Sequence, residues 1–415
     1  MLTPLINITP FRAFCFAMTL ALFELLTYIA SDVVMPAMPT VVGDLDASPE
    51  FIPHAFNLYL LGGVLLQWLI GPLADRYGRR PLLLWGCALF CVACLATHWV
   101  ESIEVFNLLR LVQGMGLGFV VTVSYPALNE AFSEADAVRM MALLANIALL
   151  SPLLGPMVGT LLLEWVSWRW LFVLFAGLAV LAWCALYRFM PETLGVERRD
   201  GSRLEFQPIH LLPLLAGYAQ LLSNRRFIAG SAALGLVGLP LIGWIGLSPV
   251  LLIHDEGLST FDYALWQLPV FGGLILGNLV INRIAERYSL RALIRKALWP
   301  YLVGLGGAML CSWLYPSVLS LVAGLSVYAL GLGIANAVLY RMTLFSSEQS
   351  KGLVSAMLGM ITIALLGLGG ALLAMLGAGA SLLSFALAAG CAGLLALWPL
   401  CTVLRADATE VVSPA

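Results

Sequence analysis

The sequence predicts an all-α integral membrane protein with twelve transmembrane helices in two six-helix halves. Of its 415 residues, 61% are hydrophobic and only 11% are charged. A soluble domain carries roughly one quarter charged residues, so this composition excludes an ordinary soluble fold. Apolar runs of about 20 residues, long enough to cross roughly 30 Å of hydrocarbon, recur along the whole chain. This repetition is typical of a polytopic membrane protein.

Twelve apolar segments define the expected helices. Their expected limits are 14–36, 55–74, 82–100, 105–127, 139–162, 169–189, 227–253, 262–283, 292–313, 317–340, 352–376 and 380–404. One long polar stretch, from Pro191 to Arg226, separates the sixth segment from the seventh. We therefore predict an N-terminal six-helix bundle over 1–190, a solvated linker over 191–226 and a C-terminal six-helix bundle over 227–415.

The distribution of basic residues predicts the orientation in the membrane. Arginines such as Arg76, Arg139 and Arg283 fall in one alternate set of loops, whereas the opposite loops hold mainly acids such as Glu50 and Asp255. Cytoplasmic loops of membrane proteins carry the excess of basic residues. Both termini and the linker are therefore expected in the cytoplasm. The first segment contains charges and lacks a signal-peptide cleavage pattern, so we interpret it as a retained helix.

Composition also limits the partners and cofactors. The net charge of −2 offers no basic surface to nucleic acid. Cys91 and Cys94 form a C-x-x-C pair, which is one arrangement used in redox chemistry. The pair lies inside an apolar segment with no second pair, so we interpret both as packing residues. The histidines are scattered and make no metal-ligand spacing, so neither a metal nor an organic cofactor is expected.

Two carboxylates inside the first apolar segment carry most of the functional information. Glu24, Tyr28 and Asp32 are spaced at intervals of four, which places them on one broad helix face with the acids about 12 Å apart along the axis. That distance is too long for one shared proton and suits two acids at different depths of one cavity. Apolar surroundings favour a protonated acid, whereas entering water or a cation favours ionisation, which is a physical basis for exchanging a proton for a substrate. The alternative is that one acid only pairs structurally, for example with Arg110.

Two further patterns follow in the N-terminal half. Gly71 to Pro81 (GPLADRYGRRP) follows the second segment, and within it Asp75 precedes Arg79 by four residues, which is within pairing reach. Arg110 to Gly116 (RLVQGMG) places a permanent positive charge inside the fourth segment, where it needs acceptors or an anion nearby. The alternative for Gly71 to Pro81 is a basic loop that only sets the orientation in the membrane. The alternative for Arg110 is a structural cation that is hydrogen-bonded to backbone carbonyls.

Small residues and prolines mark the fifth segment. Ala142, Ser151, Gly155 and Gly159 permit close contact with another helix. The prolines at 152 and 156 should bend the helix, because proline has no backbone N–H to donate. The alternative is ordinary packing of small residues.

These patterns, with the acidic, proline-ended stretch from Ser31 to Pro39 (SDVVMPAMP), resemble those of the major facilitator superfamily. Together with the ranges 58–81, 144–159, 239–244 and 328–345, they resemble the MdfA-type multidrug/proton antiporters of the twelve-helix drug:proton antiporter family. Ser31 stands where that type usually has asparagine. The resemblance implies the major facilitator fold, proton and drug coupling through the two first-helix acids, and lipophilic neutral, zwitterionic and cationic drugs as substrates, such as chloramphenicol and quaternary cations.

The residues and the resemblance together give three groups of candidate site residues. Proton coupling is assigned to Glu24, Asp32 and Arg110. Substrate binding is assigned to Glu24, Tyr28, Ser31, Asp32, Asn57, Leu61, Phe119, Leu144, Ala148, Leu239, Pro240 and Trp244. Gating is assigned to Asp75, Arg79, Glu130, Gly155, Pro156 and Gly159.

We therefore expect a proton-driven multidrug efflux antiporter of the bacterial inner membrane, working as a monomer by alternating access and not as an enzyme. A proton-coupled importer of a metabolite or sugar would share the fold, but its site would need many polar side chains, which the helix centres lack. An enzyme would need a catalytic cluster, and the sequence offers no such group of His, Cys and Asp residues. A channel would need polar pore residues repeated around a symmetric assembly, and the stretch from Gly71 to Pro81 argues against it.

Overall fold

The structure is a computed structural model, and it describes residues 4–199, 201–206, 211–285, 287–349 and 351–410. A few side chains within these ranges, among them that of Ala142, lie outside the described part. The chain divides into two compact units. Unit 1 comprises Met1–Ser48 and Leu58–Leu211, and unit 2 comprises Pro49–Asn57 and Leu212–Ala415.

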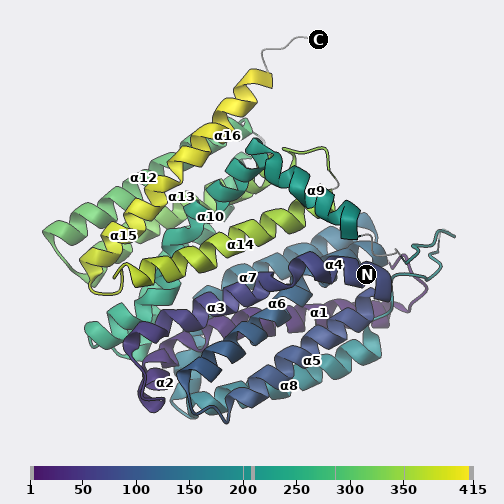
Figure 1. Cartoon of the computed structure of the whole chain (residues 1–415), viewed down its shortest axis with the longest axis horizontal. Helices are drawn as coiled ribbons and strands as arrows, with labels where there is room; N and C mark the ends of the chain where they lie inside the picture. Colours follow the sequence, from purple (N-terminus) through teal and green to yellow (C-terminus); the bar gives the residue numbers. More distant parts are fainter. Residues whose placement is uncertain (1–3, 200, 207–210, 286, 350, 411–415) are drawn as a thin grey trace. The chain divides into compact units, whose positions relative to one another are not determined.

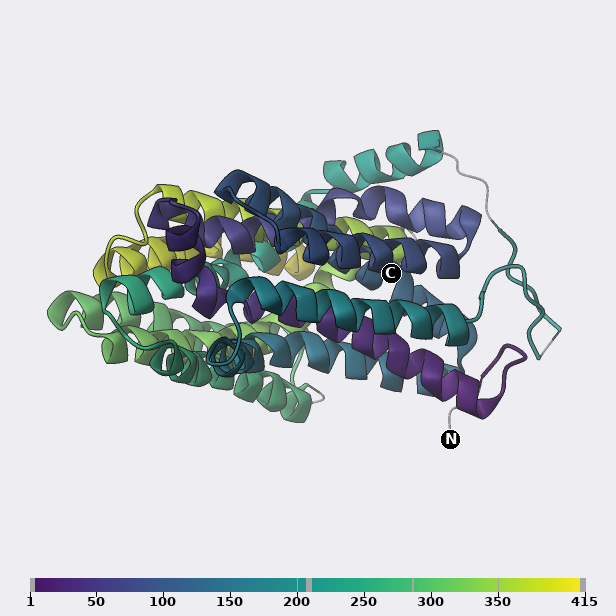
Figure 2. The same ribbon diagram turned by 90° about the horizontal axis from the view of Figure 1, so that it is seen from below.

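Unit 1 is a bundle of long helices in which α1 is central. Its packing partners are α6, α7 and α8, and Figure 2 shows α1 alongside α8, while α5 and α8 run side by side in Figure 1. The elements are α1 (Pro10–Asp32), η1 (Met35–Ala37), α2 (Met38–Asp44), α3 (Ile52–Leu65), α4 (Gln67–Tyr77), α5 (Arg79–Thr97), α6 (Ile103–Ala131), α7 (Glu134–Leu163) and α8 (Trp168–Phe189). The first residues of α3, together with η2 (Pro49–Phe51), belong to unit 2.

Unit 2 is a second helix bundle, in which α13 packs on α11 and α12, and α10 packs on α14. Its helices are α9 (Leu211–Ser223), α10 (Arg225–Ser248), the π-helical η3 (Pro249–Asp255), α11 (Thr260–Ile284), α12 (Leu290–Leu314), α13 (Val318–Leu344), α14 (Lys351–Met375), α15 (Leu382–Leu395) and α16 (Leu397–Glu410). The π-helical turn continues α10 directly after Ser248, so the two form one apolar span of 31 residues.

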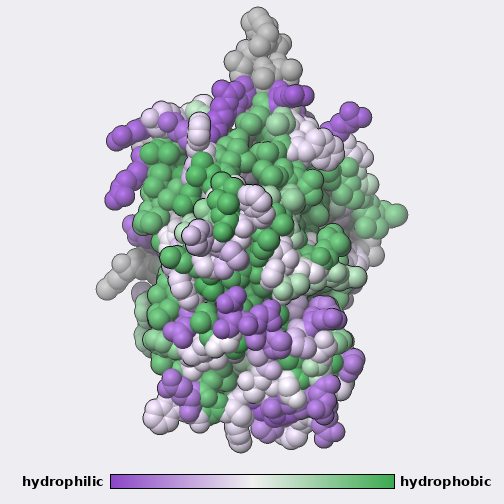
Figure 3. Space-filling model, turned by 90° about the vertical axis from the view of Figure 1, so that its left-hand side faces the viewer, coloured by the Kyte–Doolittle hydropathy of each residue, from purple (hydrophilic) through white to green (hydrophobic). Residues whose placement is uncertain are grey.

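The predicted all-α membrane class is confirmed. Among the described residues, 10 helices are long and apolar enough to cross a membrane, and two bent helix pairs raise the number to as many as 12. Large hydrophobic side chains, including Trp85, Trp299 and Trp398, are exposed on the outside. On the face shown in Figure 3, hydrophobic residues cover much of the upper part, and hydrophilic residues gather lower down. Such surfaces suit contact with lipid, since a soluble protein rarely exposes apolar patches of this extent.

The two bent pairs fall in the second and fifth predicted segments. The segment expected as one helix over 55–74 is divided at Leu66 into α3 and α4, whose axes differ by 41°. The fifth segment bends by 48° between Arg139–Ala148 and Leu150–Leu163. This second bend confirms the prediction from the prolines, because Pro152 cannot donate a hydrogen bond to the carbonyl of Ala148.

The stretch 191–226, predicted as a solvated linker, is more ordered than expected. Thr193 and Leu194 are buried in unit 1, and α9 occupies part of the remainder. The reason is local, because Glu192 and Thr193 bind charged and polar groups at the end of the unit 1 bundle, as described below. Most described residues from 197 to 206 are exposed, as a solvated linker would be.

Candidate functional site

Asp32 lies at the C-terminal end of α1 and faces α7. Its side chain is only 3% exposed, and its Oδ2 accepts a hydrogen bond of 2.7 Å from the hydroxyl of Ser151. The close approach of the two helices depends on Gly155 and Gly159. A methyl group on Gly155 would lie 2.5 Å from Cβ of Asp32, and one on Gly159 would lie 2.2 Å from the carbonyl oxygen of Val33. The small residues of the fifth segment therefore place α7 directly against the carboxylate.

Glu24 lies two turns earlier on α1 and is fully buried. Its Oε1 accepts a hydrogen bond of 3.3 Å from the hydroxyl of Tyr125 on α6, whereas Oε2 has no hydrogen-bond partner among the described residues. A buried oxygen without a partner is costly, and more so when the group is ionised. The site therefore holds a carboxyl group with one oxygen open to a proton or a ligand.

Arg110 lies on α6, fully buried, and contacts the same end of α1. Its guanidinium donates hydrogen bonds to the carbonyl oxygens of Ala30 (3.2 Å) and Ser31 (3.5 Å) and to Oε1 of Gln113 (2.8 Å). It also lies 4.6 Å above the ring centroid of Tyr59, which is within cation–π range. Among the described residues, Arg110 forms no ion pair with a carboxylate, so it acts on Asp32 through space and through the helix end that it binds.

Supporting contacts hold this arrangement in place. Gln113 donates to the hydroxyl of Thr97 at 2.8 Å, and the hydroxyl of Tyr59 donates to the carbonyl of Thr27 on α1. The hydroxyl of Ser31 donates a hydrogen bond of 2.7 Å to the backbone carbonyl of Tyr28, which also lies on α1. The hydroxyl of Ser31 therefore interacts within α1, with this carbonyl and with the neighbouring carboxylate of Asp32.

The remaining unit 1 candidates for substrate binding differ in their surroundings. Leu144 is buried, while Leu61 and Ala148 are half-buried. Phe119 packs against Gly86 of α5, where an added methyl would lie 2.3 Å from Cβ of Phe119. This contact between α5 and α6 gives Phe119 the surroundings of a packing residue.

The other four candidates belong to unit 2. Leu239 and Pro240 are buried on α10, and Pro240 lies against Gly393 of α15. Trp244 is fully buried, stacks edge to face on Phe385 at 5.9 Å, and has an indole N–H without a hydrogen-bond partner. Asn57 is 2% exposed, and neither polar atom of its amide has a partner in the part of the chain that the structure describes, which holds for the Trp244 indole too. Two buried polar side chains of unit 2 are thus open to a ligand or water.

The three charged gating candidates meet in one network within unit 1. Arg79 forms an ion pair of 2.6 Å with Asp75, as the spacing of four predicted, and a second of 2.8 Å with Glu130 at the end of α6. Arg79 is 7% exposed. The side chain of Asp75 is 44% exposed and that of Glu130 only 14%, so removing Glu130 would leave the buried charge of Arg79 without its better shielded partner, which is costly. The network therefore connects the ends of α4, α5 and α6.

Glu192 completes this network, and no sequence pattern pointed to this role. Its carboxylate accepts hydrogen bonds from the backbone N–H groups of Arg79 (2.9 Å) and Arg80 (3.2 Å), and so caps the N-terminus of α5. Gly78, with φ of 104°, makes room for it, since a side chain there would lie 2.3 Å from the carboxylate oxygen. Thr193 donates to Glu130 at 2.5 Å.

The acidic and histidine residues do not assemble into a metal site in the described part of the chain. There, no group of three or more His, Cys, Asp or Glu side chains lies close enough to hold a metal ion. The chemistry available in unit 1 is therefore that of buried, hydrogen-bonded acids beside a fixed cation. Such a site can bind and release protons and can attract a cation.

Residues 20–362 match the family described as Major Facilitator Superfamily, and the chain belongs to that superfamily. Solved structures agree in fold. A bacterial homolog of the human lysosomal transporter Spinster, inward-facing and unoccupied, matches with a TM-score of 0.71 and 14% identity over 99% of this chain and 100% of that one. A D-xylose-proton symporter matches with a TM-score of 0.74 and 15% identity over 94% and 97%. At these identities the likeness shows the fold alone.

Curated relatives are much more similar in sequence. The multidrug transporter MdfA of Yersinia pestis bv. Antiqua (strain Angola) is 46% identical over 362 residues, which is 86% of either chain. The multidrug transporter MdfA of Edwardsiella ictaluri is 46% identical over 360 residues, again 86% of either chain. That of Escherichia coli is 44% identical over 362 residues with the same coverage.

Proposed function

We propose that this chain is a proton-driven multidrug exporter of the bacterial inner membrane, which moves lipophilic neutral and cationic drugs by alternating access. The observation that carries the proposal is the pair of buried acids on α1, Glu24 and Asp32, in a chain 46% identical over 86% of its length to multidrug transporters. Protons and drugs are its partners, it works as a monomer, and both termini face the cytoplasm.

The two acids have different roles in this proposal. Asp32 is held by Ser151 and lies at the helix end whose carbonyls bind Arg110, so its ionised form has a hydrogen-bond donor and a nearby positive charge. Glu24 has one oxygen bound to Tyr125 and one without a partner. Glu24 is therefore the acid better placed to meet a cationic drug, and Asp32 is the one better placed to exchange protons.

The network around Arg79 supplies the gate. We infer that Asp75, Arg79 and Glu130 hold the helix ends of unit 1 together in the state whose cavity faces outward. Because a shift of about 1.4 kcal/mol changes a two-state population tenfold, a few partly buried ion pairs suffice to set which state dominates. Gly155, Pro156 and Gly159 contribute by letting α7 bend and stay in contact with α1.

A drug-susceptibility panel with and without a protonophore tests the function. Cells that lack their own efflux pumps and express the chain should tolerate more chloramphenicol and more of a quaternary cation such as tetraphenylphosphonium. The same cells should retain accumulated drug once the protonophore is added. Cells expressing the chain with Glu24→Gln and Asp32→Asn are the matched control. Unchanged susceptibility to every drug, combined with uptake of a sugar or metabolite, would instead support the importer alternative.

A further inference from the structure

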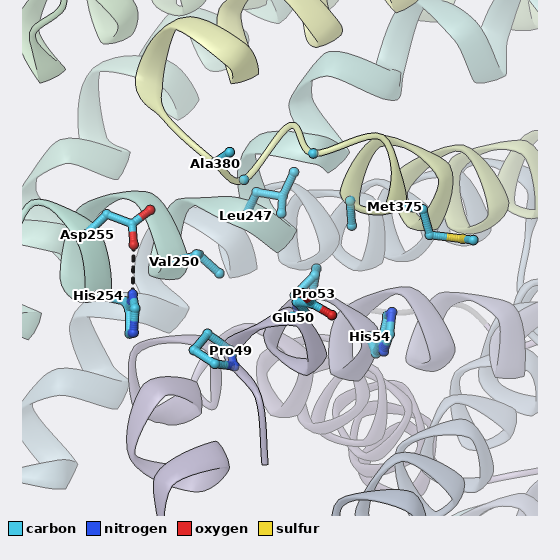
Figure 4. Close-up of a pocket in the computed structure, with 13 residues that line it drawn as sticks. Pro49, Glu50, Pro53, His54, Leu247, Val250, His254, Asp255, Met375 and Ala380 are labelled. Atoms are coloured by element: carbon cyan, nitrogen blue, oxygen red, sulfur yellow. Dashed lines mark hydrogen bonds and ion pairs between the residues drawn. The ribbon is translucent and has the colours of Figure 1, made fainter.

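Unit 2 contains a pocket that the proposed function does not use. It encloses about 410 Å³, within the range of roughly 300–1,000 Å³ found for small-molecule sites. Its walls come from η2 and the start of α3, from the end of α10 with η3, and from the turn between α14 and α15. Its lining includes the side chains of Glu50, His54, Leu247, Val250, Asp255 and Met375 (Figure 4).

The permanently charged side chains of the pocket are acidic, and two histidines, His54 and His254, line it beside them. Two carboxylates, Glu50 and Asp255, line it, and the described residues of its lining include no lysine or arginine. Asp255 contacts Nδ1 of His254 at 2.7 Å, and the side chain of Asp255 remains 35% exposed. Figure 4 shows Asp255 and His254 on one side of the pocket, with Glu50 nearer its middle. Carboxylates on apolar walls attract a cation more strongly than the same groups do in open water.

Apart from the two acids and the two histidines, the lining consists of apolar residues and glycines. Leu247 and Val250 present aliphatic side chains from α10 and η3, Pro53 presents its ring from α3, and Met375 adds a thioether from the end of α14. Methionine adapts its shape to varied ligands and is common at permissive binding surfaces. A small hydrated metal ion would gain nothing from such walls, and no metal-holding group of acidic, histidine or cysteine residues exists in the described chain.

We propose that this pocket is a binding site for lipophilic organic cations, in addition to the buried acids of unit 1. A bulky cation with apolar arms suits both features, since its charge meets Glu50 and Asp255 while its arms cover Leu247, Val250 and Met375. Both carboxylates come from the acidic set of loops that is expected outside the cytoplasm, so the pocket is a site for a drug on its way out or for one returning from outside. The pocket needs only unit 2 residues and does not depend on coupling to protons.

Calorimetric titration of the purified full chain in lipid nanodiscs tests the site, with tetraphenylphosphonium as the probe. The starting variant carries Glu24→Gln and Asp32→Asn, which remove the unit 1 acids. We expect this variant to bind one tetraphenylphosphonium. Adding Glu50→Gln and Asp255→Asn should weaken that binding at least tenfold, whereas Glu256→Gln, an exposed neighbour that does not line the pocket, should change it less than twofold.

A second variant separates loss of the site from loss of the fold. Ala380→Trp keeps both carboxylates and fills the pocket from the exposed turn, so it too should weaken binding at least tenfold. Neutral triphenylphosphine oxide should not bind. The proposal is overturned if the starting variant binds no probe, if the carboxylate and tryptophan changes leave binding intact, or if Glu256→Gln weakens it equally. Because binding is measured directly, absence of drug resistance in cells would overturn the proposed export and leave this result standing.

Discussion

Replacing Gly155 by alanine tests whether close contact between α1 and α7 builds the site around Asp32. The added methyl would lie 2.5 Å from Cβ of Asp32 and 3.3 Å from its backbone carbonyl carbon. Neither atom belongs to the far end of a flexible side chain, so one of the helices must move. Overpacking of this kind costs about 1–3 kcal/mol, while alanine in a helix is otherwise favoured over glycine by about 0.5–1 kcal/mol.

Alanine variants of two other glycines provide comparisons for the stability of Gly155→Ala. Gly177 on α8 has nothing within 4 Å of an added methyl, so Gly177→Ala should stabilise the protein by about 0.5–1 kcal/mol. Gly159→Ala would bring a methyl to 2.2 Å from a backbone oxygen and should be the most destabilising of the three. Gly155→Ala should be less stable than Gly177→Ala by about 1–3 kcal/mol, which is the overpacking term alone.

Unfolding in mixed micelles with increasing sodium dodecyl sulfate gives the free energy of unfolding for each variant. Drug transport by cells that express the same variants shows whether the site is disturbed, because movement of α7 also lengthens the 2.7 Å hydrogen bond from Ser151 to Asp32. Gly155→Ala should lose drug export while Gly177→Ala retains it. If the variants at 155 and 177 were equally stable and equally active, the argument that close packing positions Asp32 would be refuted.

Three further predictions concern charge. Glu24→Gln combined with Asp32→Asn should abolish drug-driven proton movement in everted vesicles, followed by a pH-sensitive dye, and a response at the wild-type rate would disprove the coupling role. Glu24→Gln alone should reduce resistance to quaternary cations more than resistance to chloramphenicol, since only the cation needs the charge; equal losses would count against this role. Asp75→Asn should favour the inward-open state and slow turnover while drug binding survives. Labelling of cysteines introduced on the two sides of the membrane measures this shift, and an unchanged labelling pattern would reduce the stretch from Gly71 to Pro81 to an orientation signal.

Local sequence signals predicted much of the fold because membrane helices are determined by local composition. Apolar runs gave the helices, the prolines gave the bend in α7, and the spacing of four gave the ion pair between Asp75 and Arg79. The division of the second segment at Leu66 was not predicted. There the sequence remains apolar on both sides, and composition alone does not distinguish a straight helix from a bent one.

The partners of the two acids could not be predicted, for a different physical reason. Tyr125 lies 101 residues from Glu24, and Ser151 lies 119 residues from Asp32. Each is an ordinary polar residue in an apolar helix, and its role depends on which helix packs against α1. The partner of Arg110 is local by contrast, because Gln113 lies three residues after the arginine on the same helix face and accepts its hydrogen bond.

The hydrogen-bond partners that the structure shows change how Glu24 and Asp32 are interpreted. Spacing alone made Glu24 and Asp32 equivalent, two carboxylates on one face of a helix. Their surroundings distinguish them, because Asp32 has Ser151 and the Arg110-bound helix end, while Glu24 keeps an oxygen with no partner. An acid already supplied with donors can exchange a proton without a ligand, whereas a buried oxygen without a donor gains most when a ligand arrives. In the proposed function, the division of labour between proton and drug therefore follows from the helices packed against α1 and not from α1 itself.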